Sequence, residues 1–451
     1  MDRKTFLQQT ALATSALMVP SWLQAKNKEA NKDTRVVIIG AGFAGLAAAY
    51  RLHKEKIPFI VLESRGRIGG RVFSYKMTED LVIELGGEWV GNSHTRIQEL
   101  CKELHLTLEN NQFDTHLIYK GQYNRSGAWD YSDSWKKKFT TILKNYAHMT
   151  EADKQALDQY DWWRYLVDNG CDGRDLDIRE LLDSTDFGES IRHVSAFAAL
   201  SEYAESSPKN EMDLKIKGGN GSLAEAIRDK VGQENILLKH TVKKIQQGTR
   251  IKVYADNGAM IQCDRLICTA PAFALSQIAF EPGLPKAYIA ALKQLQYARI
   301  NKHALHFSER FWKDESFDLI SDQGPQYFYH ATKNQASKEG VLIAYSIGDK
   351  AAMNAAYPKD NALRDVFRCL EPHFGSIQQL LKKQVNYYWG NDPLSHGAYA
   401  LYGINQWYTI RPILRKPIGH IHFAGEHLAD WQGFMEGAIN TGEEAVAALN
   451  L

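Results

Sequence analysis

The sequence predicts an α/β protein with a Rossmann-type nucleotide-binding domain at its centre. Three observations predict this fold class: an apolar, β-branched run over residues 34–39 ("TRVVII"), a glycine pattern directly after it, and a stretch of small residues ("LAAAYRLHKE") typical of a closely packed helix. A buried strand, a glycine-rich turn and a helix in this order form the first half of a dinucleotide-binding βαβ unit.

Each glycine of the turn has its own physical reason. Gly40 permits the tight turn after the strand, Gly42 lets the backbone approach a pyrophosphate, and Gly45 lets the helix pack closely on the strand. The phosphates would lie at the helix N-terminus, where unpaired N–H groups and the helix dipole favour negative charge. A second apolar strand, "FIVLE", ends at Glu63, where an acid binds ribose hydroxyls and repels the 2′-phosphate of NADP.

Composition excludes several other classes of protein. Lys and Arg together number 54 and Asp and Glu 53, so no strong field indicates a nucleic-acid partner. The sequence contains no H-E-x-x-H, no G-x-S-x-G and no cysteine pair at zinc spacing, so neither a metal site nor a hydrolase is predicted. The five cysteines fit no disulfide framework: Cys101, Cys171, Cys263, Cys268 and Cys369.

The first 25 residues have the layout of an export signal. They combine a basic start, an apolar stretch over residues 11–20 and a small residue at Ala25. "DRKTFLQ" is similar to a twin-arginine signal with Lys4 in place of the second arginine, which predicts a periplasmic protein. The apolar stretch is too short for a stable membrane span. If the segment is not a signal, the protein is expected in the cytoplasm.

Longer motifs at both ends of the chain carry a family resemblance. Glu63 begins "ESRGRIGGRVFS", residues 83–91 read "IELGGEWVG", and residues 420–446 read "HIHFAGEHLADWQGFMEGAINTGEEAV". Together these motifs resemble the flavin-containing amine oxidases, the group of monoamine oxidases, polyamine oxidases and L-amino acid oxidases. The resemblance extends over most of the chain after residue 33, and it implies FAD as the cofactor.

The resemblance also implies a role for individual residues at the FAD site. Glu63 would bind the adenosine ribose, Arg71 would lie against the diphosphate, and Met435 would begin a helix whose N-terminus faces the flavin pyrimidine. A helix N-terminus there would stabilise the negative charge of reduced flavin. The expected cofactor-binding residues are Gly40, Gly42, Ala44, Gly45, Glu63, Arg65, Gly70, Arg71, Gly87, Glu88, Trp89, Val242, Gly425, Glu426 and Met435.

The expected domains are built from discontinuous segments. "GGNGSLAEAI", residues 218–227, matches the family stretch where the FAD domain resumes after a first excursion. We therefore expect an FAD-binding domain from residues 34–105, 212–285 and 386–451. A mixed α+β substrate domain would comprise residues 106–211 and 286–385, with a helical block at about 134–205 and strands at 300–307 and 341–347.

Four residues would carry the chemistry, by resemblance. Lys302 lies ten residues before Trp312, the spacing of the family lysine that reaches flavin N5 through a water and supplies positive charge where dioxygen is reduced. Trp389 and Tyr399 fit the family pattern W-x-x-x-P-x-S-x-G-x-Y, and Phe434 would form a second aromatic wall beside the amine. The alternatives are an ordinary solvent-facing lysine and, for Phe434, simple core packing.

The flavin is expected to be held without a covalent bond. Monoamine oxidases carry a cysteine immediately before the tyrosine of this pattern and bond FAD through it. The present sequence has Ala398 there. An alanine side chain offers no thiol for such a bond.

The substrate class is less sharply defined. L-amino acid oxidases place an arginine near the "GG" segment to clamp a carboxylate, and this sequence has Trp89 there, although Arg96 or Arg192 could substitute. Polyamine oxidases place acids along the tunnel, for which Glu88 is a candidate. An amine without a carboxylate is favoured.

The expected reaction converts a small-molecule amine to an imine, then an aldehyde, and reduces dioxygen to hydrogen peroxide. The alternatives are an L-amino acid oxidase, a flavin-dependent dehydrogenase or desaturase that does not use dioxygen and, more distantly, a non-catalytic FAD-binding protein. No nucleic acid and no membrane span are expected, and a homodimer is left open.

Overall fold

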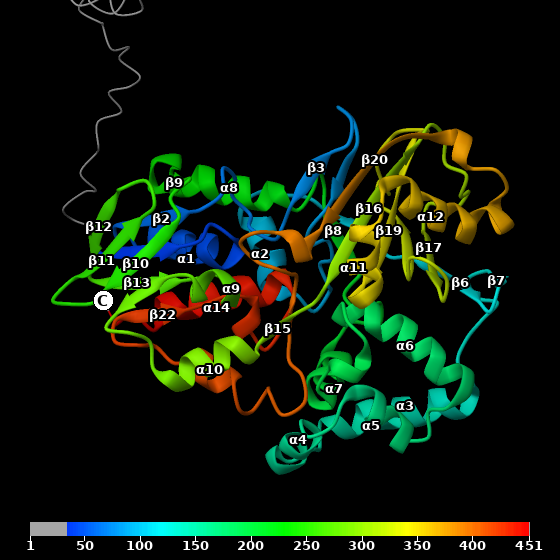
Figure 1. Cartoon of the computed structure of the whole chain (residues 1–451), viewed down its shortest axis with the longest axis horizontal. Helices are drawn as coiled ribbons and strands as arrows, with labels where there is room; N and C mark the ends of the chain where they lie inside the picture. Colours follow the sequence, from blue (N-terminus) through cyan, green and yellow to red (C-terminus); the bar gives the residue numbers. More distant parts are fainter. Residues whose placement is uncertain (1–33, 451) are drawn as a thin grey trace, which may run out of the picture.

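The structure is a computed structural model that describes residues 34–450. The expected export segment, residues 1–25, lies outside the described residues and stays a prediction. Figure 1 shows one sheet-containing part on each side of the molecule and a group of helices below the second part. Within residues 34–450, no helix is both long and apolar enough to cross a membrane.

A five-stranded parallel sheet forms the first part and confirms the predicted fold class. Its strand order is β22-β13-β1-β2-β9, and each neighbouring pair runs parallel. β1 and β2 coincide with the two predicted apolar strands. The five strands are β1 (Val36–Ile39), β2 (Phe59–Glu63), β9 (Ile236–Leu238), β13 (Arg265–Cys268) and β22 (Ile421–Phe423).

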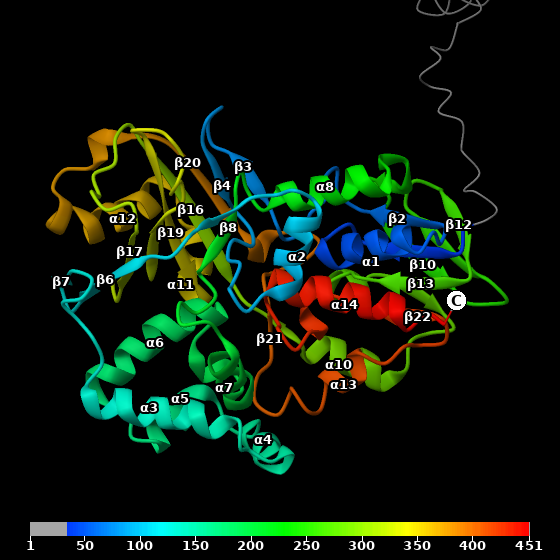
Figure 2. The same cartoon turned by 180° about the vertical axis from the view of Figure 1, so that it is seen from behind.

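Helices and a second sheet cover the two faces of this parallel sheet. On one face lie α1 (Phe43–Lys54), α8 (Gly221–Val231) and α14 (Met435–Ala447), which Figure 2 shows in front. A Cβ on Gly45 would lie 1.9 Å from the carbonyl oxygen of Gly40, and one on Gly442 would lie 2.1 Å from that of Ala44. Glycine is therefore required where α1 meets the β1 turn and where α14 crosses α1.

The other face of the parallel sheet packs on a four-stranded sheet of order β12-β11-β10-β14. Helices α9 (Ala272–Ser276), α10 (Lys286–Gln294) and α13 (Arg411–Leu414) complete this layer. The strands are β10 (Val242–Gln246), β11 (Ile251–Ala255), β12 (Met260–Cys263) and β14 (Ala279–Glu281).

A seven-stranded sheet forms the second part, in the order β20-β16-β19-β18-β17-β6-β7. Its inner strands β16 (Ile300–Phe307) and β19 (Gly340–Ile347) confirm the two strands predicted there. The other strands are β6 (Asp114–Tyr119), β7 (Gln122–Asn124), β17 (Phe317–Ser321), β18 (Tyr327–His330) and β20 (Leu381–Tyr388). Helix α12 (Lys359–Phe374) packs on one face, and α11 (Gly348–Ala356) follows β19.

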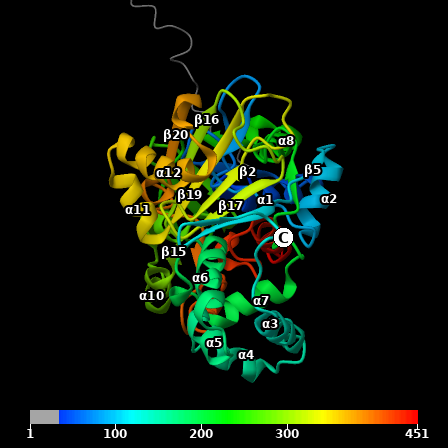
Figure 3. The ribbon, with the colours of Figure 1, turned by 90° about the vertical axis from the view of Figure 1, so that its right-hand side faces the viewer.

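The predicted helical block lies beneath the seven-stranded sheet, as Figure 3 shows. Its helices pack around Trp162, which is fully buried. They are α3 (Asp133–Tyr146), α4 (Glu151–Leu157), α5 (Trp162–Asp168), α6 (Gly173–Phe187) and α7 (Ala196–Glu205).

Short elements join the two parts, and two expected boundaries fall within or beside elements that pack across them. The boundary at residue 386 falls inside β20, which continues in the seven-stranded sheet to Tyr388. The segment that begins at residue 286 starts with α10, whose Tyr288 packs on Phe423 of the parallel sheet, 4.9 Å between ring centroids. The joining elements are β3 (Ser74–Lys76), β4 (Val82–Glu84), α2 (Thr95–Glu103), β5 (Leu108–Asn110), β8 (Leu214–Ile216), β15 (Gln296–Tyr297) and β21 (Ala400–Leu401).

Candidate active site

A cavity of about 580 Å³ lies between the parallel sheet and the seven-stranded sheet, and most of the predicted site residues line it. Every residue expected to bind the cofactor or to carry the chemistry lines it, except Gly45 and Val242. Gly45 serves the contact between α1 and the turn. Val242 is 5% exposed and packs in the core between the two sheets of the first part. The sequence motifs are therefore brought together in space.

One end of the cavity is shaped for a nucleotide. Glu63, at the end of β2, accepts hydrogen bonds of 2.7 Å from the backbone N–H groups of Ala41 and Arg65. Helix α1 begins without a side-chain cap, so its first-turn N–H groups are open to an anion. A Cβ on Gly70 would lie 3.1 Å from the Cα of Gly42. The two glycine-rich segments therefore pack closely, and no side chain at these two glycines covers the backbone. These features fit the adenosine and diphosphate of a dinucleotide.

An ion pair joins an early and a late segment of the described residues beside this cradle. Arg71 Nη1 donates to Glu426 Oε1 at 2.5 Å, and Glu426 also accepts from the backbone N–H of Gly433 at 2.8 Å. Both partners line the cavity. Burial lowers the pKa of the Arg71 guanidinium, but the Glu426 carboxylate outweighs it and raises that pKa. Arg71 therefore stays charged at the centre of the site.

Helix α14 presents its N-terminus to the cavity. Phe434 precedes the helix without a side-chain cap, and Met435 begins it; both line the cavity. A Cβ on Gly87 would lie 3.5 Å from the Met435 side chain, and one on Gly86 would lie 2.0 Å from the carbonyl oxygen of Arg71. Only glycine fits at residue 86. Without a side chain there, the backbone can lie close against a flat ring system. The placement fits the flavin end of the cofactor.

Lys302 is not a solvent-facing lysine, because it is 5% exposed and lines the cavity. Its Nζ donates to the carbonyl oxygens of Glu84 at 3.2 Å and Gly86 at 2.9 Å, and to Glu88 Oε2 at 3.1 Å. An ammonium has three hydrogens, and protein acceptors take all three. Lys302 therefore contributes positive charge to the site and has no donor left for the water that the resemblance implies.

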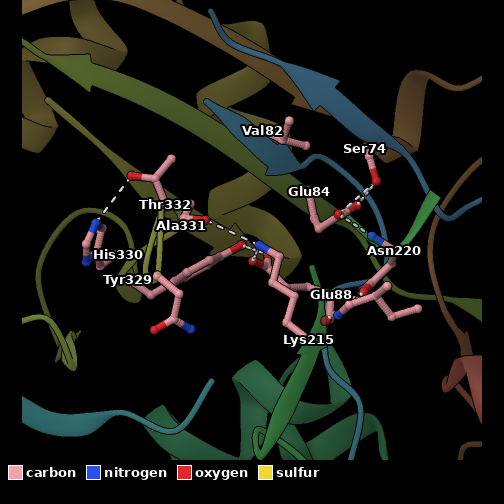
Figure 4. Close-up of polar contacts among 12 residues, drawn as sticks. Ser74, Val82, Glu84, Glu88, Lys215, Asn220, Tyr329, His330, Ala331 and Thr332 are labelled. Carbon is pink, nitrogen blue, oxygen red and sulfur yellow. Dashed lines mark hydrogen bonds and ion pairs between the residues drawn. The ribbon is translucent and has the colours of Figure 1, made fainter. Parts of the chain in front are cut away.

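Two buried partners of Glu88 were missed by sequence reasoning. Glu88 accepts from Lys215 Nζ at 2.9 Å and from the Tyr329 hydroxyl at 2.5 Å (Figure 4). It also accepts from Lys302. Burial raises the pKa of Glu88, but the two lysines outweigh it and hold that pKa below its usual value. Glu88 thus already binds two lysines and one hydroxyl, which compensate its charge, and its role as a substrate-binding acid stays a prediction. No local motif marks Lys215, since it comes from a distant strand.

Aromatic side chains wall the cavity between the two sheets. The Tyr399 hydroxyl donates to the carbonyl oxygens of Thr185, at 3.2 Å, and Asp186. Phe434 packs on His94, 5.0 Å between ring centroids, and a Cβ on Gly433 would lie 3.0 Å from the Tyr399 ring. Trp389 Nε1 donates to the carbonyl oxygen of Leu85 at 2.8 Å. These hydrogen bonds and ring contacts fix the orientation of the aromatic side chains in the cavity wall.

The remaining part of the cavity is lined by acids. Asp186 accepts from the Tyr203 hydroxyl at 2.6 Å, and Asp318 accepts from the Tyr327 hydroxyl at 2.8 Å. Burial raises the pKa of each carboxyl to about 7. Asp318 Oδ1 is buried and has no hydrogen-bond partner. This end of the cavity therefore offers one buried carboxylate oxygen, Asp318 Oδ1, that lacks a donor.

Positive charge at the acidic end comes from Arg179, which binds Asp183 at 3.2 Å and lines the cavity. The two arginines considered as carboxylate clamps lie elsewhere. Arg96 binds Glu443 at 2.8 Å, and Arg192 stacks on Trp163 at 3.8 Å; neither lines the cavity. In the part of the chain that the structure describes, no group of three His, Cys, Asp or Glu residues could hold a metal ion.

The fold and the site define a flavin-dependent oxidoreductase. The family model of the flavin-containing amine oxidoreductases matches residues 43–450, and the chain belongs to this family. It acts on amines as a member of that family, and the match implies a flavin cofactor.

Relatives match over nearly the whole chain. "Probable flavin-containing monoamine oxidase A" of Dictyostelium discoideum is 26% identical, over 90% of this chain and 95% of the relative. Human flavin-containing amine oxidase B is 26% identical, over 91% of this chain and 85% of the relative. Among solved structures, putrescine oxidase bound to putrescine superposes with a TM-score of 0.83 and cyclohexylamine oxidase from Brevibacterium oxydans with 0.82. Each is 21% identical and covers 92% of this chain and 98% of its own, and shows the fold.

Proposed function

We propose that the protein is an FAD-dependent amine oxidase that uses dioxygen. The substrate amine loses two electrons and two protons and becomes an imine, which water hydrolyses to an aldehyde, while dioxygen gains both and leaves as hydrogen peroxide. The bound flavin would supply the electron-transfer chemistry. The observation that carries the proposal is the single cavity that joins a dinucleotide cradle at Glu63 to the buried Lys302 and the aromatic walls.

The chain's own residues would bind, orient and shield the amine. Tyr399 and Phe434 offer uncharged ring faces that align an amine and exclude water. Lys302 would place positive charge where dioxygen becomes negatively charged. Ala398 lines the cavity without a thiol, which supports a non-covalent cofactor. Because the reacting amine must be neutral, activity is expected to rise with pH through the ionisation of the bound amine.

The acidic end of the cavity favours a substrate with a second positive charge. Asp186, Glu202 and Asp318 line this end, where three acids face one arginine. Arg179 binds Asp183 through Nη1, and its buried Nε has no hydrogen-bond partner. An ammonium group donates three hydrogen bonds and would satisfy the unpartnered Asp318 Oδ1. A substrate carboxylate would instead meet acids whose pKa values burial already raises, and its negative charge would oppose their ionisation further. The lining thus supports a diamine over an amino acid.

Anaerobic reduction followed by admission of air tests the proposal. An oxidase is reduced by its amine and reoxidised fast, a dehydrogenase or desaturase is reduced but reoxidised slowly, and a binding protein is never reduced. Monoamines, diamines and amino acids of equal chain length form the panel. We expect the highest kcat/KM with diamines. If kcat/KM is equal for monoamines of the same length, the diamine assignment is wrong, but the assignment as an amine oxidase stands.

A further inference from the structure

Two lysines and one carboxylate form a buried cluster behind the Gly86 segment. Glu88 Oε1 accepts from Lys215, and Glu88 Oε2 accepts from Lys302 and the Tyr329 hydroxyl. The side chains of Glu88, Lys302 and Lys215 are 1%, 7% and 11% exposed. Two ammonium groups on one carboxylate leave one positive charge in excess, in a region where water screens charge poorly.

The two lysines lie on different sides of Glu88. Lys302 lines the cavity, whereas Lys215 does not. Lys215 instead points to the carbonyl oxygen of Ala331, 3.3 Å away, at the end of β18 (Figure 4). Without Lys215, the Glu88 carboxylate would face Lys302 alone and would cancel its charge. Lys215 would therefore determine how much of the Lys302 charge reaches the cavity.

We propose that Lys215 is a positioning residue that neutralises Glu88, so that Lys302 acts on the flavin side of the cavity as an uncompensated positive charge. The inference rests on the proposed function, because it gives the Lys302 charge an effect on bound flavin. The result would be a bound flavin whose reduced, negatively charged form is favoured and whose reaction with dioxygen is faster.

Glu84 is a further acid beside the cluster, and its backbone carbonyl oxygen accepts from Lys302. It accepts from Ser74 Oγ at 2.8 Å and from the Asn220 backbone N–H at 2.8 Å, and burial raises its pKa to about 7. At pH 6 Glu84 is mostly protonated and therefore neutral. The net charge of the cluster is then set by two lysines and the one carboxylate of Glu88. The measurements below are made at that pH.

The test compares holoenzyme variants by the midpoint potential of bound flavin and by the rate of reoxidation with air. We expect Lys215→Met to lower the ratio of reduced to oxidised flavin at fixed potential by about 3- to 10-fold, where tenfold corresponds to about 30 mV for a two-electron couple. Reoxidation should slow in parallel. Lys217→Met is the matched control, since Lys217 lies two residues further along and is exposed; it should change neither quantity.

A charge-restoring variant separates electrostatics from packing. Lys215→Met combined with Glu88→Gln removes one positive and one negative charge and should return both quantities toward wild type. The glutamine oxygen can still accept from Lys302 and Tyr329. If the double variant is worse than Lys215→Met, Lys215 acts only through packing and the inference is overturned. If Lys215→Met does not fold, Glu88→Gln alone still tests the inference. It removes the negative charge beside Lys302 and should therefore raise the midpoint potential of the bound flavin.

The inference and the proposed function fail in different ways. If Lys302→Met slows reoxidation while Lys215→Met behaves as Lys217→Met, the inference is wrong and the role of Lys302 stands. If neither Lys302→Met nor Lys215→Met changes reoxidation or potential, the role of Lys302 falls and the inference with it.

Discussion

Arg65 binds Asp392 through two hydrogen bonds of 2.9 and 2.7 Å, although 327 residues separate them in the chain. Arg65 follows the Glu63 strand, and Asp392 lies in the loop that runs from Trp389 to Tyr399. Asp392 Oδ1 also accepts from the backbone N–H and hydroxyl of Ser395. The pair thus fixes an aromatic-bearing loop to the nucleotide cradle.

Asp392→Asn is expected to loosen this junction. Burial raises the pKa of Asp392, but Arg65 and Ser395 outweigh it and hold the pKa well below its usual value, so the carboxylate is charged at neutral pH. Its loss leaves Arg65, 16% exposed, without its counter-charge. We expect a loss of about 2 to 3 kcal/mol in unfolding free energy, measured by denaturation of the apoprotein. Glu55→Gln, in the exposed pair with Arg51, is the control and should cost under about 0.5 kcal/mol.

Lys302→Met is expected to split the two half-reactions. Flavin reduction by the amine should stay largely intact, while reoxidation by dioxygen should slow at least ~10-fold, about 1.4 kcal/mol of transition-state stabilisation. Because protein acceptors take all three hydrogens, charge rather than a held water explains the effect, and Lys302→Arg should retain more reactivity than Lys302→Gln. Stopped-flow absorbance measures both steps. Normal reoxidation in Lys302→Met would refute the role.

The cofactor is expected to leave the denatured protein. Ala398 lines the cavity and stands where the family resemblance places the thiol of a covalent link. Acid precipitation of the holoenzyme should release free yellow flavin into the supernatant, which absorbance at visible wavelengths measures. Flavin that stays with the precipitate would show that another residue bonds it.

Asp318→Asn is expected to reduce the preference for diamines. Asp318 Oδ1 is unpartnered at the acidic end of the cavity, and an ammonium bound there would gain a charge-assisted hydrogen bond worth roughly 1.5 to 3 kcal/mol. The variant should therefore lower kcat/KM for a diamine by about 10- to 100-fold and leave that for a monoamine of equal length within about twofold. Asp349→Asn, at an exposed acid paired with Arg299, is the control. An equal loss for both substrates would indicate a structural role.

The nucleotide half of the fold was predictable because its information is local. The strand, glycine turn, helix and Glu63 lie within a short stretch, and the structure confirms β1, α1 and β2 there. The buried position of Lys302 follows from the register of β16, where Lys302 pairs with Tyr345 of β19 on the face toward the cavity. That register, and the acids of α6, α7 and β17, depend on contacts between distant segments. No pattern in the sequence places Lys215 against Glu88 or Asp318 beside Tyr327.

Exact domain boundaries are hard to place from the sequence for a related reason. Helix α10 has the same amphipathic pattern whichever sheet it covers, so the sequence does not show that Tyr288 packs on Phe423. Likewise, β20 carries no signal where the chain leaves the seven-stranded sheet after Tyr388. Packing partners, rather than local propensity, decide where each part ends.

Glu84→Gln is expected to change how stability depends on pH. The carboxyl of Glu84 titrates near 4.5 when unfolded, whereas burial raises its pKa to about 7 in the folded protein. Between these values the folded state holds a proton that the unfolded state has released, so this group makes stability fall as pH rises and contributes no further change above about pH 7. The cost to the folded state is roughly 3 to 4 kcal/mol at alkaline pH.

The glutamine variant removes this proton linkage and keeps the shape of the side chain. Its amide oxygen can accept from Ser74 and from the Asn220 backbone N–H as Glu84 does. Unfolding free energies of the apoprotein, measured with denaturant at pH 5, 6, 7 and 8, should fall less steeply for Glu84→Gln than for the wild type. Asp186 and Asp318, with pKa values raised to about 7, keep part of the slope in both proteins. The difference between the two curves should therefore grow from pH 5 to pH 7 and then stay constant; parallel curves would show that Glu84 is ionised in the folded protein throughout this range.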